Sequence, residues 1–329
     1  MLKTRIASLV VFASLTVVGQ ASAASTPKPV APLPPTRGVV LVTTDLAYQN
    51  AEAAGTGIVL TSAGEVLTNN HVIRGATTIR IVIPATHKSY PADVVGYDIA
   101  DDIALLKVNG APKLATATRA DSTKLRVGQF ARAVGNANGG GKLVITTGTL
   151  TGLNRTITIG NEDGTTSQLT GLIQTSARLV PGDSGGPLLD ATGRVIGVDA
   201  AGSANYAIQK SDGYAIPINR AYSLVKLMRA GAESSLVHVG KTAFLGVTIA
   251  SGARGLVIGT IIEGSAAANA GLQPGNIFTA LEGVQVQTLD DVRRVLFTHH
   301  PGETITVDYL DSFGQAATTQ LTLGDGPPQ

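Results

Sequence analysis

Short runs of β-branched and aliphatic residues, separated by turns that contain glycine, make up most of the chain from residue 38 onwards. In residues 78–83, isoleucines alternate with an arginine and a valine, which is the two-residue period of a strand with one buried face. Similar runs predict strands at 38–42, 56–60, 66–69, 92–95, 103–108, 130–134, 143–150, 156–159, 171–175, 186–189, 195–200 and 213–218. Strands this short, without a regular alternation of strand and helix, indicate an antiparallel sandwich or closed barrels.

A helical pattern follows this region. Residues 219–231 place their apolar side chains on one face, with Asn219 in position to cap the helix and Gly231 in position to end it. The sequence therefore predicts a mainly β domain over 38–232 that closes with a single helix.

The last segment, 241–325, follows a short linker at 233–240 and mixes both patterns. Thr288 and Asp291 have the spacing of a capping box at the start of a helix. We predict strands at 244–247, 256–258, 277–281 and 304–309, and helices at 265–270 and 288–297. This segment is therefore expected to form a small, separate α+β domain.

The N-terminus has the features of an export signal. Lys3 and Arg5 precede an uncharged, mostly apolar run, and Ala21-Ser22-Ala23 provides small residues at the spacing that a signal peptidase recognises. We predict a signal peptide over 1–23, with an uncleaved anchor as the alternative, followed by a proline-rich, extended linker over 24–37. The protein is accordingly expected in the cell envelope or outside the cell.

The amino-acid composition excludes several kinds of partner and catalytic group. The formal net charge is only +2 and no basic cluster is present, which argues against nucleic acid as a partner. The absence of cysteine excludes disulfides and a thiolate nucleophile. The histidines at 87, 238, 299 and 300 lack ligand spacing, and the glycine-rich residues 138–142 lack the flanking residues of a phosphate loop. We therefore predict neither a metal nor another cofactor.

The residues best suited to chemistry lie in 181–187, Pro-Gly-Asp-Ser-Gly-Gly-Pro, called the serine loop below. Serine is a weak nucleophile unless a base removes its proton, so a catalytic Ser184 requires a histidine and a carboxylate elsewhere. His71, after a predicted strand, and Asp102, before another, supply them in the order His, Asp, Ser that chymotrypsin-type barrels use. In this hypothesis the backbone N–H groups of Gly182 and Ser184 form the oxyanion hole.

Each of these residues also has a structural explanation. A single histidine after a strand is usually a packing or surface residue, Asp101-Asp102 could be solvated charges, and the serine loop could be a tight turn. Their combination, in this order and in these contexts, favours the triad His71, Asp102 and Ser184.

The same stretches resemble the HtrA (DegP-like) family of serine proteases, from about residue 38 to 325. Within the family, Gly-Asp-Ser in place of the usual Gly-Asn-Ser resembles the secreted mycobacterial type. The resemblance implies a chymotrypsin-like double β-barrel followed by a PDZ domain, an endopeptidase that acts on unfolded or damaged proteins, and a homotrimer. It is carried by residues 55–59, 67–73, 101–108, 134–136, 171–175, 181–187 and 213–218.

The resemblance also assigns binding residues. Leu179, Val198, Asp199 and Ala200 would form an apolar pocket for small aliphatic side chains of a substrate. Residues 175–179 depart from the family pattern here, and Arg178 among them is expected to point to solvent. Asp183 is expected to serve loop geometry only.

In the PDZ segment, the resemblance implies a groove that captures peptide C-termini as an added strand. The groove residues are Phe244, Leu245, Gly246, Val247, Val292 and Leu296. The alternative is a small domain that only packs on the protease. For the whole protein, the alternatives to an endopeptidase are a proteolytically weak chaperone or peptide-binding protein and an esterase.

Overall fold

The computed structural model describes residues 32–160, 166–200 and 213–329. The predicted signal peptide and residues 24–31 of the predicted linker lie outside these ranges. Within them, no helix has both the length and the apolar character needed to cross a membrane.

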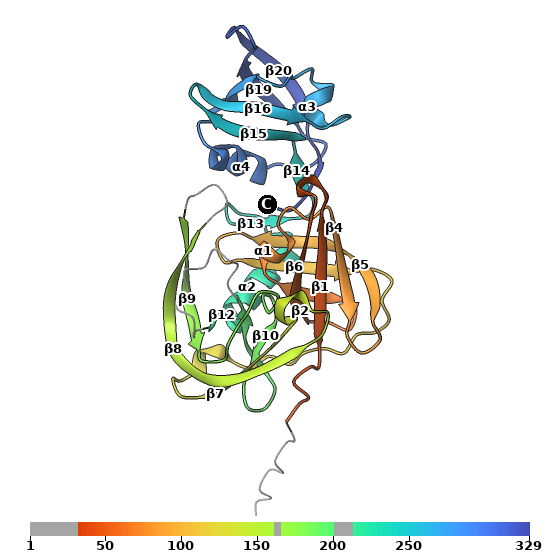
Figure 1. Cartoon of the computed structure of the whole chain (residues 1–329), viewed down its shortest axis with the longest axis vertical. Helices are drawn as coiled ribbons and strands as arrows, with labels where there is room; N and C mark the ends of the chain where they lie inside the picture. Colours follow the sequence, from red (N-terminus) through yellow and green to blue (C-terminus); the bar gives the residue numbers. More distant parts are fainter. Residues whose placement is uncertain (1–31, 161–165, 201–212) are drawn as a thin grey trace, which may run out of the picture. The chain divides into compact units, whose positions relative to one another are not determined.

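The first strands of the described chain, between residues 39 and 108, form a closed antiparallel barrel (Figure 1). The strand order is β5-β4-β1-β2-β3-β6, and the pairing of β5 with β6 closes the ring. Ile79 and Ile81 are buried and Arg80 is exposed, as the two-residue period predicts. The strands are β1 (Val39–Leu46), β2 (Ala51–Val59), β3 (Glu65–Thr68), β4 (Thr78–Ile83), β5 (Lys88–Asp98) and β6 (Ile103–Val108).

A second closed barrel follows, in the order β10-β11-β12-β9-β8-β7. β8 is one long strand with register shifts against β9, where the sequence predicts two strands. One buried cluster of this barrel combines alanines, including Ala131, Ala133 and Ala215, with an equal number of leucines and isoleucines. The strands are β7 (Phe130–Gly135), β8 (Val144–Gly160), β9 (Thr166–Thr175), β10 (Pro187–Leu189), β11 (Val195–Asp199) and β12 (Gly213–Pro217).

Two helices belong to this double barrel. The short α1 (Asn70–Ile73), which the sequence pattern does not predict, follows β3 directly. α2 (Ile218–Arg229) buries Ile218, Ala221, Val225 and Met228. The prediction that Asn219 caps α2 is wrong: Pro217 is the N-cap, and the Asn219 amide donates to Asp121 Oδ1 at 2.8 Å. Three short 3₁₀ helices are η1 (Ala47–Gln49), η2 (Ser122–Lys124) and η3 (Ala137–Gly139).

Within the predicted linker, β13 (Val237–Val239) pairs with β5 and so extends the first sheet. The last segment contains a sheet in the order β15-β16-β17-β19-β20, with β18 on β17, and a separate pair of β14 with β21. The predicted capping box of Thr288 and Asp291 is confirmed. The elements are β14 (Thr242–Phe244), β15 (Val247–Gly252), β16 (Gly255–Ile261), α3 (Ala266–Asn269), β17 (Ile277–Leu281), β18 (Val284–Gln285), α4 (Leu289–Phe297), β19 (Thr304–Leu310), β20 (Ala316–Thr322) and β21 (Gly324–Gly326).

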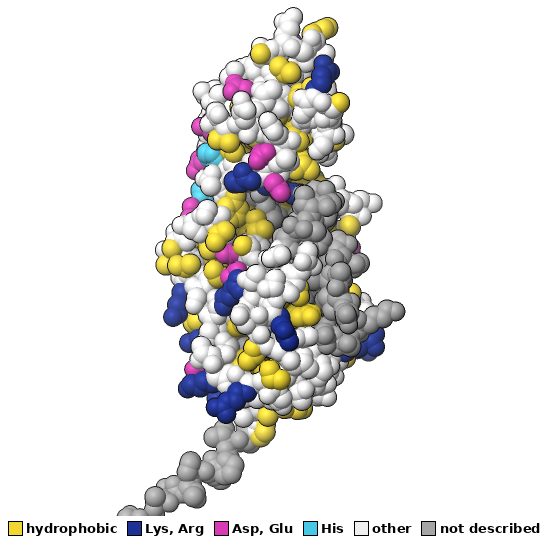
Figure 2. Space-filling view, turned by 90° about the vertical axis from the view of Figure 1, so that its left-hand side faces the viewer, with side chains coloured by type: hydrophobic (Ala, Val, Ile, Leu, Met, Phe, Trp, Pro, Cys, Tyr) yellow, Lys and Arg dark blue, Asp and Glu magenta, His cyan; other side chains and the backbone are white. Residues whose placement is uncertain are grey.

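The molecular surface is chemically mixed. On the face drawn in Figure 2, Lys and Arg side chains lie at several separate places, with hydrophobic side chains and acidic groups between them.

Candidate active site

The predicted catalytic histidine is held by the predicted carboxylate through two contacts. His71 lies on α1, and its backbone N–H donates to Asp102 Oδ1 at 2.8 Å. The ring Nδ1 lies 2.7 Å from Asp102 Oδ2. Since an ionised carboxylate only accepts, Nδ1 carries the proton and Nε2 is left to take one from a nucleophile. Asp102 therefore fixes both the position and the tautomer of the imidazole.

Asp102 itself has a constrained backbone. Its φ is 52°, in the left-handed region, which costs an L-residue roughly 1–2 kcal/mol and which Asp tolerates better than most. The Asn69 side-chain amide donates to the Asp102 carbonyl at 2.8 Å. The Asp102 side chain is only 10% exposed. This conformation turns the Asp102 side chain back toward α1.

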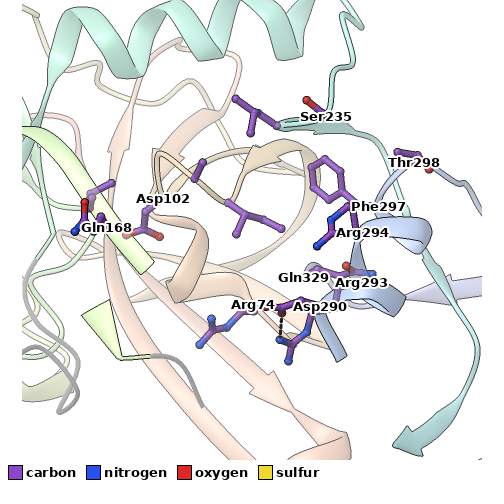
Figure 3. Close-up of a pocket in the computed structure, with 14 residues that line it drawn as sticks. Arg74, Asp102, Gln168, Ser235, Asp290, Arg293, Arg294, Phe297, Thr298 and Gln329 are labelled. Atoms are coloured by element: carbon purple, nitrogen blue, oxygen red, sulfur yellow. Dashed lines mark hydrogen bonds and ion pairs between the residues drawn. The ribbon is translucent and has the colours of Figure 1, made fainter. Parts of the chain in front are cut away.

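A cavity of about 480 Å³ borders this carboxylate (Figure 3). Asp102, Gln168 of β9 and Arg74, which follows α1, are among the residues that line it. In Figure 3, Asp102 and Gln168 lie on the same side of the cavity. Asp102 therefore contributes to the wall of this cavity as well as to the contacts with His71.

The serine loop belongs to the second barrel, and Thr56 of β2 ties it to the first. The Ser184 carbonyl accepts from the Thr56 N–H at 2.8 Å, and the Gly182 carbonyl accepts from Thr56 Oγ1 at 2.7 Å. A Cβ on Gly55 would lie 2.6 Å from the Val72 side chain and 3.2 Å from the Ser184 carbonyl oxygen. Because Val72 follows His71, β2 brings α1 and the serine loop against the same short stretch of backbone.

Gly182 meets the requirements of an oxyanion donor. Its φ is 93°, and a Cβ there would overlap the carbonyl oxygen of Asn136, so no other residue fits. Its N–H donates no hydrogen bond to any residue in the described ranges. The N–H groups of Gly185 and Gly186, in contrast, donate to the carbonyls of Asp199 and Asp183 at 2.8 and 2.9 Å.

The serine loop contains one buried carboxyl group, Asp183, and a second, Asp199, contacts the loop through its backbone. Asp183 Oδ2 accepts from the Val180 N–H at 2.9 Å, and burial raises the pKa of Asp183 to about 6. Asp199 is fully buried, and neither of its carboxyl oxygens has a partner among the described residues. Burial, followed by repulsion from Asp183, raises the Asp199 pKa well above its usual value. Burial therefore favours the neutral form of the Asp199 carboxyl group.

The predicted substrate pocket is only partly described. Leu179 is half-buried beside Gly213, where a Cβ would lie 2.7 Å from Leu179 Cγ. Val198 and Ala200 are fully buried core residues, and Arg178 is exposed. β11, which carries Val198, ends at Asp199, and residues 201–212 lie outside the described ranges. The aliphatic pocket therefore remains a prediction.

The predicted peptide groove lies between β15 and α4. Among the described strands β15 pairs only with β16, so its other edge is open to an added strand. Leu245, Val292 and Leu296 are buried in the core of the segment, Val247 is half-buried, and Gly246 has a φ of 80°. The Phe244 ring stacks on Tyr48, with the ring centroids 5.3 Å apart.

The sequence indicated no role for two polar residues that support the site. Thr56 and Asn69 act through contacts with residues far along the chain, which no local pattern reveals. The Gly55-Thr56-Gly57 stretch appears only among the residues that carry the family resemblance.

Comparisons with known proteins agree with this geometry. The model of the trypsin-like peptidase domain matches residues 55–198, and that of the PDZ domain matches residues 257–309. The HtrA-type protease AlgW in complex with a tripeptide has a TM-score of 0.50 and 25% identity, over 89% of this chain and 95% of that one. The predicted mainly β, chymotrypsin-like double barrel with a C-terminal PDZ domain is thereby confirmed.

Sequence relatives identify the family. The serine protease Do-like HtrA of Lactococcus lactis is 31% identical over 291 residues, which is 82% of this chain and 70% of that protein. The serine protease PepD of Mycobacterium tuberculosis is 31% identical, over 87% of this chain and 63% of PepD. DegQ of Escherichia coli is 34% identical, over 85% of this chain and 61% of DegQ. The chain therefore spans less than two thirds of PepD and DegQ. It belongs to the HtrA family of serine proteases.

Proposed function

We propose that this protein is an exported serine endopeptidase that hydrolyses peptide bonds of unfolded or damaged proteins. The observation that carries the proposal is the double contact of the Asp102 carboxylate with the backbone and ring of His71. Family membership supports the same activity. The name of DegQ, a periplasmic pH-dependent serine endoprotease, supports export.

In the proposed mechanism, His71 Nε2 accepts the Ser184 proton as Oγ attacks the peptide carbonyl. Asp102 stabilises the resulting imidazolium, and His71 then gives the proton to the leaving amine. The Gly182 and Ser184 N–H groups donate to the oxyanion of the tetrahedral intermediate. In the first half-reaction the C–N bond breaks, the amine leaves and the acyl group is esterified to Ser184 Oγ. In the second, His71 deprotonates a water that attacks this ester, which releases the new carboxyl terminus and returns the proton to Ser184.

The C-terminal segment would bind peptide C-termini along the open edge of β15. A free carboxylate would reach the backbone N–H groups of residues 244–247. The trimer that the family resemblance implies belongs to the same proposal, and sedimentation velocity tests it.

The decisive experiment compares wild type with Ser184→Ala on unfolded casein. We expect digestion by wild type alone, together with fluorophosphonate labelling that maps to Ser184. Equal digestion by both proteins would exclude the enzyme and leave the chaperone alternative. Turnover of an ester substrate without turnover of the matched peptide would indicate an esterase instead.

A further inference from the structure

The triad carboxylate lies at the end of a tight turn between β5 and β6, residues 98–102, called the aspartate turn below. Buried Asp98 accepts the Asp101 N–H on Oδ1 at 2.7 Å, and the Asp102 N–H donates to the Ile99 carbonyl at 3.3 Å. Asp101, directly before Asp102, shares a peptide bond with it. A backbone rotation at Asp101 therefore changes the direction in which the Asp102 side chain leaves the turn.

One guanidinium group fixes Asp101 from outside the turn. Arg220, in the first turn of α2, donates from Nε to Asp101 Oδ2 at 2.5 Å and from Nη2 to Asp101 Oδ1. Two parallel N–H···O bonds to one carboxylate fix its orientation as well as its distance. A lysine ammonium, as a point charge, cannot reproduce this geometry.

The same guanidinium also contacts the second barrel. Its Nη1 donates to the Thr170 carbonyl of β9 at 2.5 Å. Gly171, with a φ of 70°, allows this approach, since a Cβ there would lie 3.1 Å from Nη1. Arg220 thus joins the aspartate turn, a strand of the other barrel and α2 through one planar group.

We propose that Arg220 is a positioning residue for the triad: its clamp on Asp101 holds the left-handed Asp102 in line with His71. The inference rests on the proposed peptidase function for its kinetic part only. Arg220 has no contact with the reacting atoms, so its effect passes through Asp101 and Asp102 to the imidazole.

The same helix provides a matched control. Arg229, at the other end of α2, forms an equivalent bidentate pair with Glu65, with Nε–Oε1 and Nη2–Oε2 distances of 3.0 and 2.7 Å. The side-chain exposures of the two pairs are similar, 33% and 17% for Arg220–Asp101 and 27% and 21% for Arg229–Glu65. Loss of either ion pair should therefore lower the free energy of unfolding by a similar amount. Only the Arg220–Asp101 pair, however, adjoins the proposed triad.

The kinetic test compares Arg220→Ala and Arg220→Lys with Arg229→Ala, using a fluorogenic peptide. We expect both Arg220 variants to lose about ten- to hundredfold in kcat with little change in KM, while Arg229→Ala keeps the kcat of the wild type. Millimolar guanidinium should restore part of the kcat of Arg220→Ala, and ethylammonium should not. Equal kcat in Arg220→Ala and Arg229→Ala, or no rescue by guanidinium, would overturn the proposal.

A second measurement does not depend on turnover. In the proton NMR spectrum, the Nδ1–H of His71 bonded to Asp102 should give a far-downfield signal, assigned by its absence in His71→Ala. We expect this signal in wild type and Arg229→Ala, and its loss or broadening in Arg220→Ala. An unchanged signal in Arg220→Ala would refute the clamp. A changed signal in a protein that digests nothing would support the clamp and reject the peptidase.

Discussion

Replacement of Asp183 by Asn should change how stability depends on pH. Burial raises the pKa of Asp183 from 3.8 to about 6, so the folded state holds this proton more tightly than the unfolded state does. Stability from this group is therefore fully present below the unfolded pKa and is lost as the pH rises through about 6. At about 1.4 kcal/mol for each pKa unit, the loss amounts to about 3 kcal/mol by neutral pH.

The amide introduced by Asp183→Asn would keep an oxygen to accept the Val180 N–H but could not ionise. Any fixed cost of burying the amide is independent of pH. The difference in unfolding free energy, Asp183→Asn minus wild type, should therefore rise by about 3 kcal/mol between roughly pH 3 and pH 7.5.

Urea unfolding followed by circular dichroism measures this difference, because the chain has no tryptophan to report by fluorescence. Both proteins should carry Ser184→Ala, which prevents self-digestion. A difference that stays constant across the pH range would show that Asp183 ionises as an ordinary carboxyl group. With Ser184 restored, Asp183→Asn should retain peptidase activity, because its role is in loop geometry.

Two substitutions test the active site, and a comparison of two peptides tests the predicted PDZ groove. Gly182→Ala should lower Tm and reduce kcat by about 10²–10³, because the added Cβ overlaps the Asn136 carbonyl oxygen and displaces an oxyanion donor. A normal kcat, measured below the Tm of the variant, would exclude this role. Thr56→Val removes the hydroxyl that accepts from the Asn136 N–H and donates to the Gly182 carbonyl. We expect the free energy of unfolding in urea to fall by about 2–4 kcal/mol. A change near zero would contradict the role of this hydroxyl. A peptide with a free C-terminus should bind the PDZ segment at least about tenfold more tightly than its amidated form in calorimetry, and equal affinities would reject carboxylate capture.

Local periodicity was sufficient to predict most of the barrel strands, because apolar and polar residues alternate along a strand with one buried face. It failed where structure depends on distant partners. The Asn219 amide bonds Asp121 rather than capping α2, and β13 forms because β5 offers it an open edge. The four-residue α1 is too short to show a helical period.

In the candidate site, too, local motifs were predictable and contacts between distant residues were not. Motif order alone indicated His71, Asp102 and Ser184, since the chemistry of a triad restricts the residue types. The supporting residues could not be inferred, because Thr56, Asn69 and Arg220 act across separations of 33 to 126 residues. The sequence analysis places Asp199 in an apolar substrate pocket. In the structure its carboxyl group is buried without a partner among the described residues. The alternation of residues in a strand does not predict that a polar side chain is buried in this way.

Besides the apolar core that the two barrels share, two polar connections between them reach the residues proposed for the triad. Thr56 of the first barrel holds the serine loop of the second, and Arg220 holds the aspartate turn of the first barrel against β9 of the second. Each barrel has its own closed ring of strands, so breaking one connection leaves the backbone pairing of both barrels intact. Because transition-state stabilisation depends on sub-ångström placement while stability sums over the whole core, changes at these two points should reduce kcat before they unfold the protein.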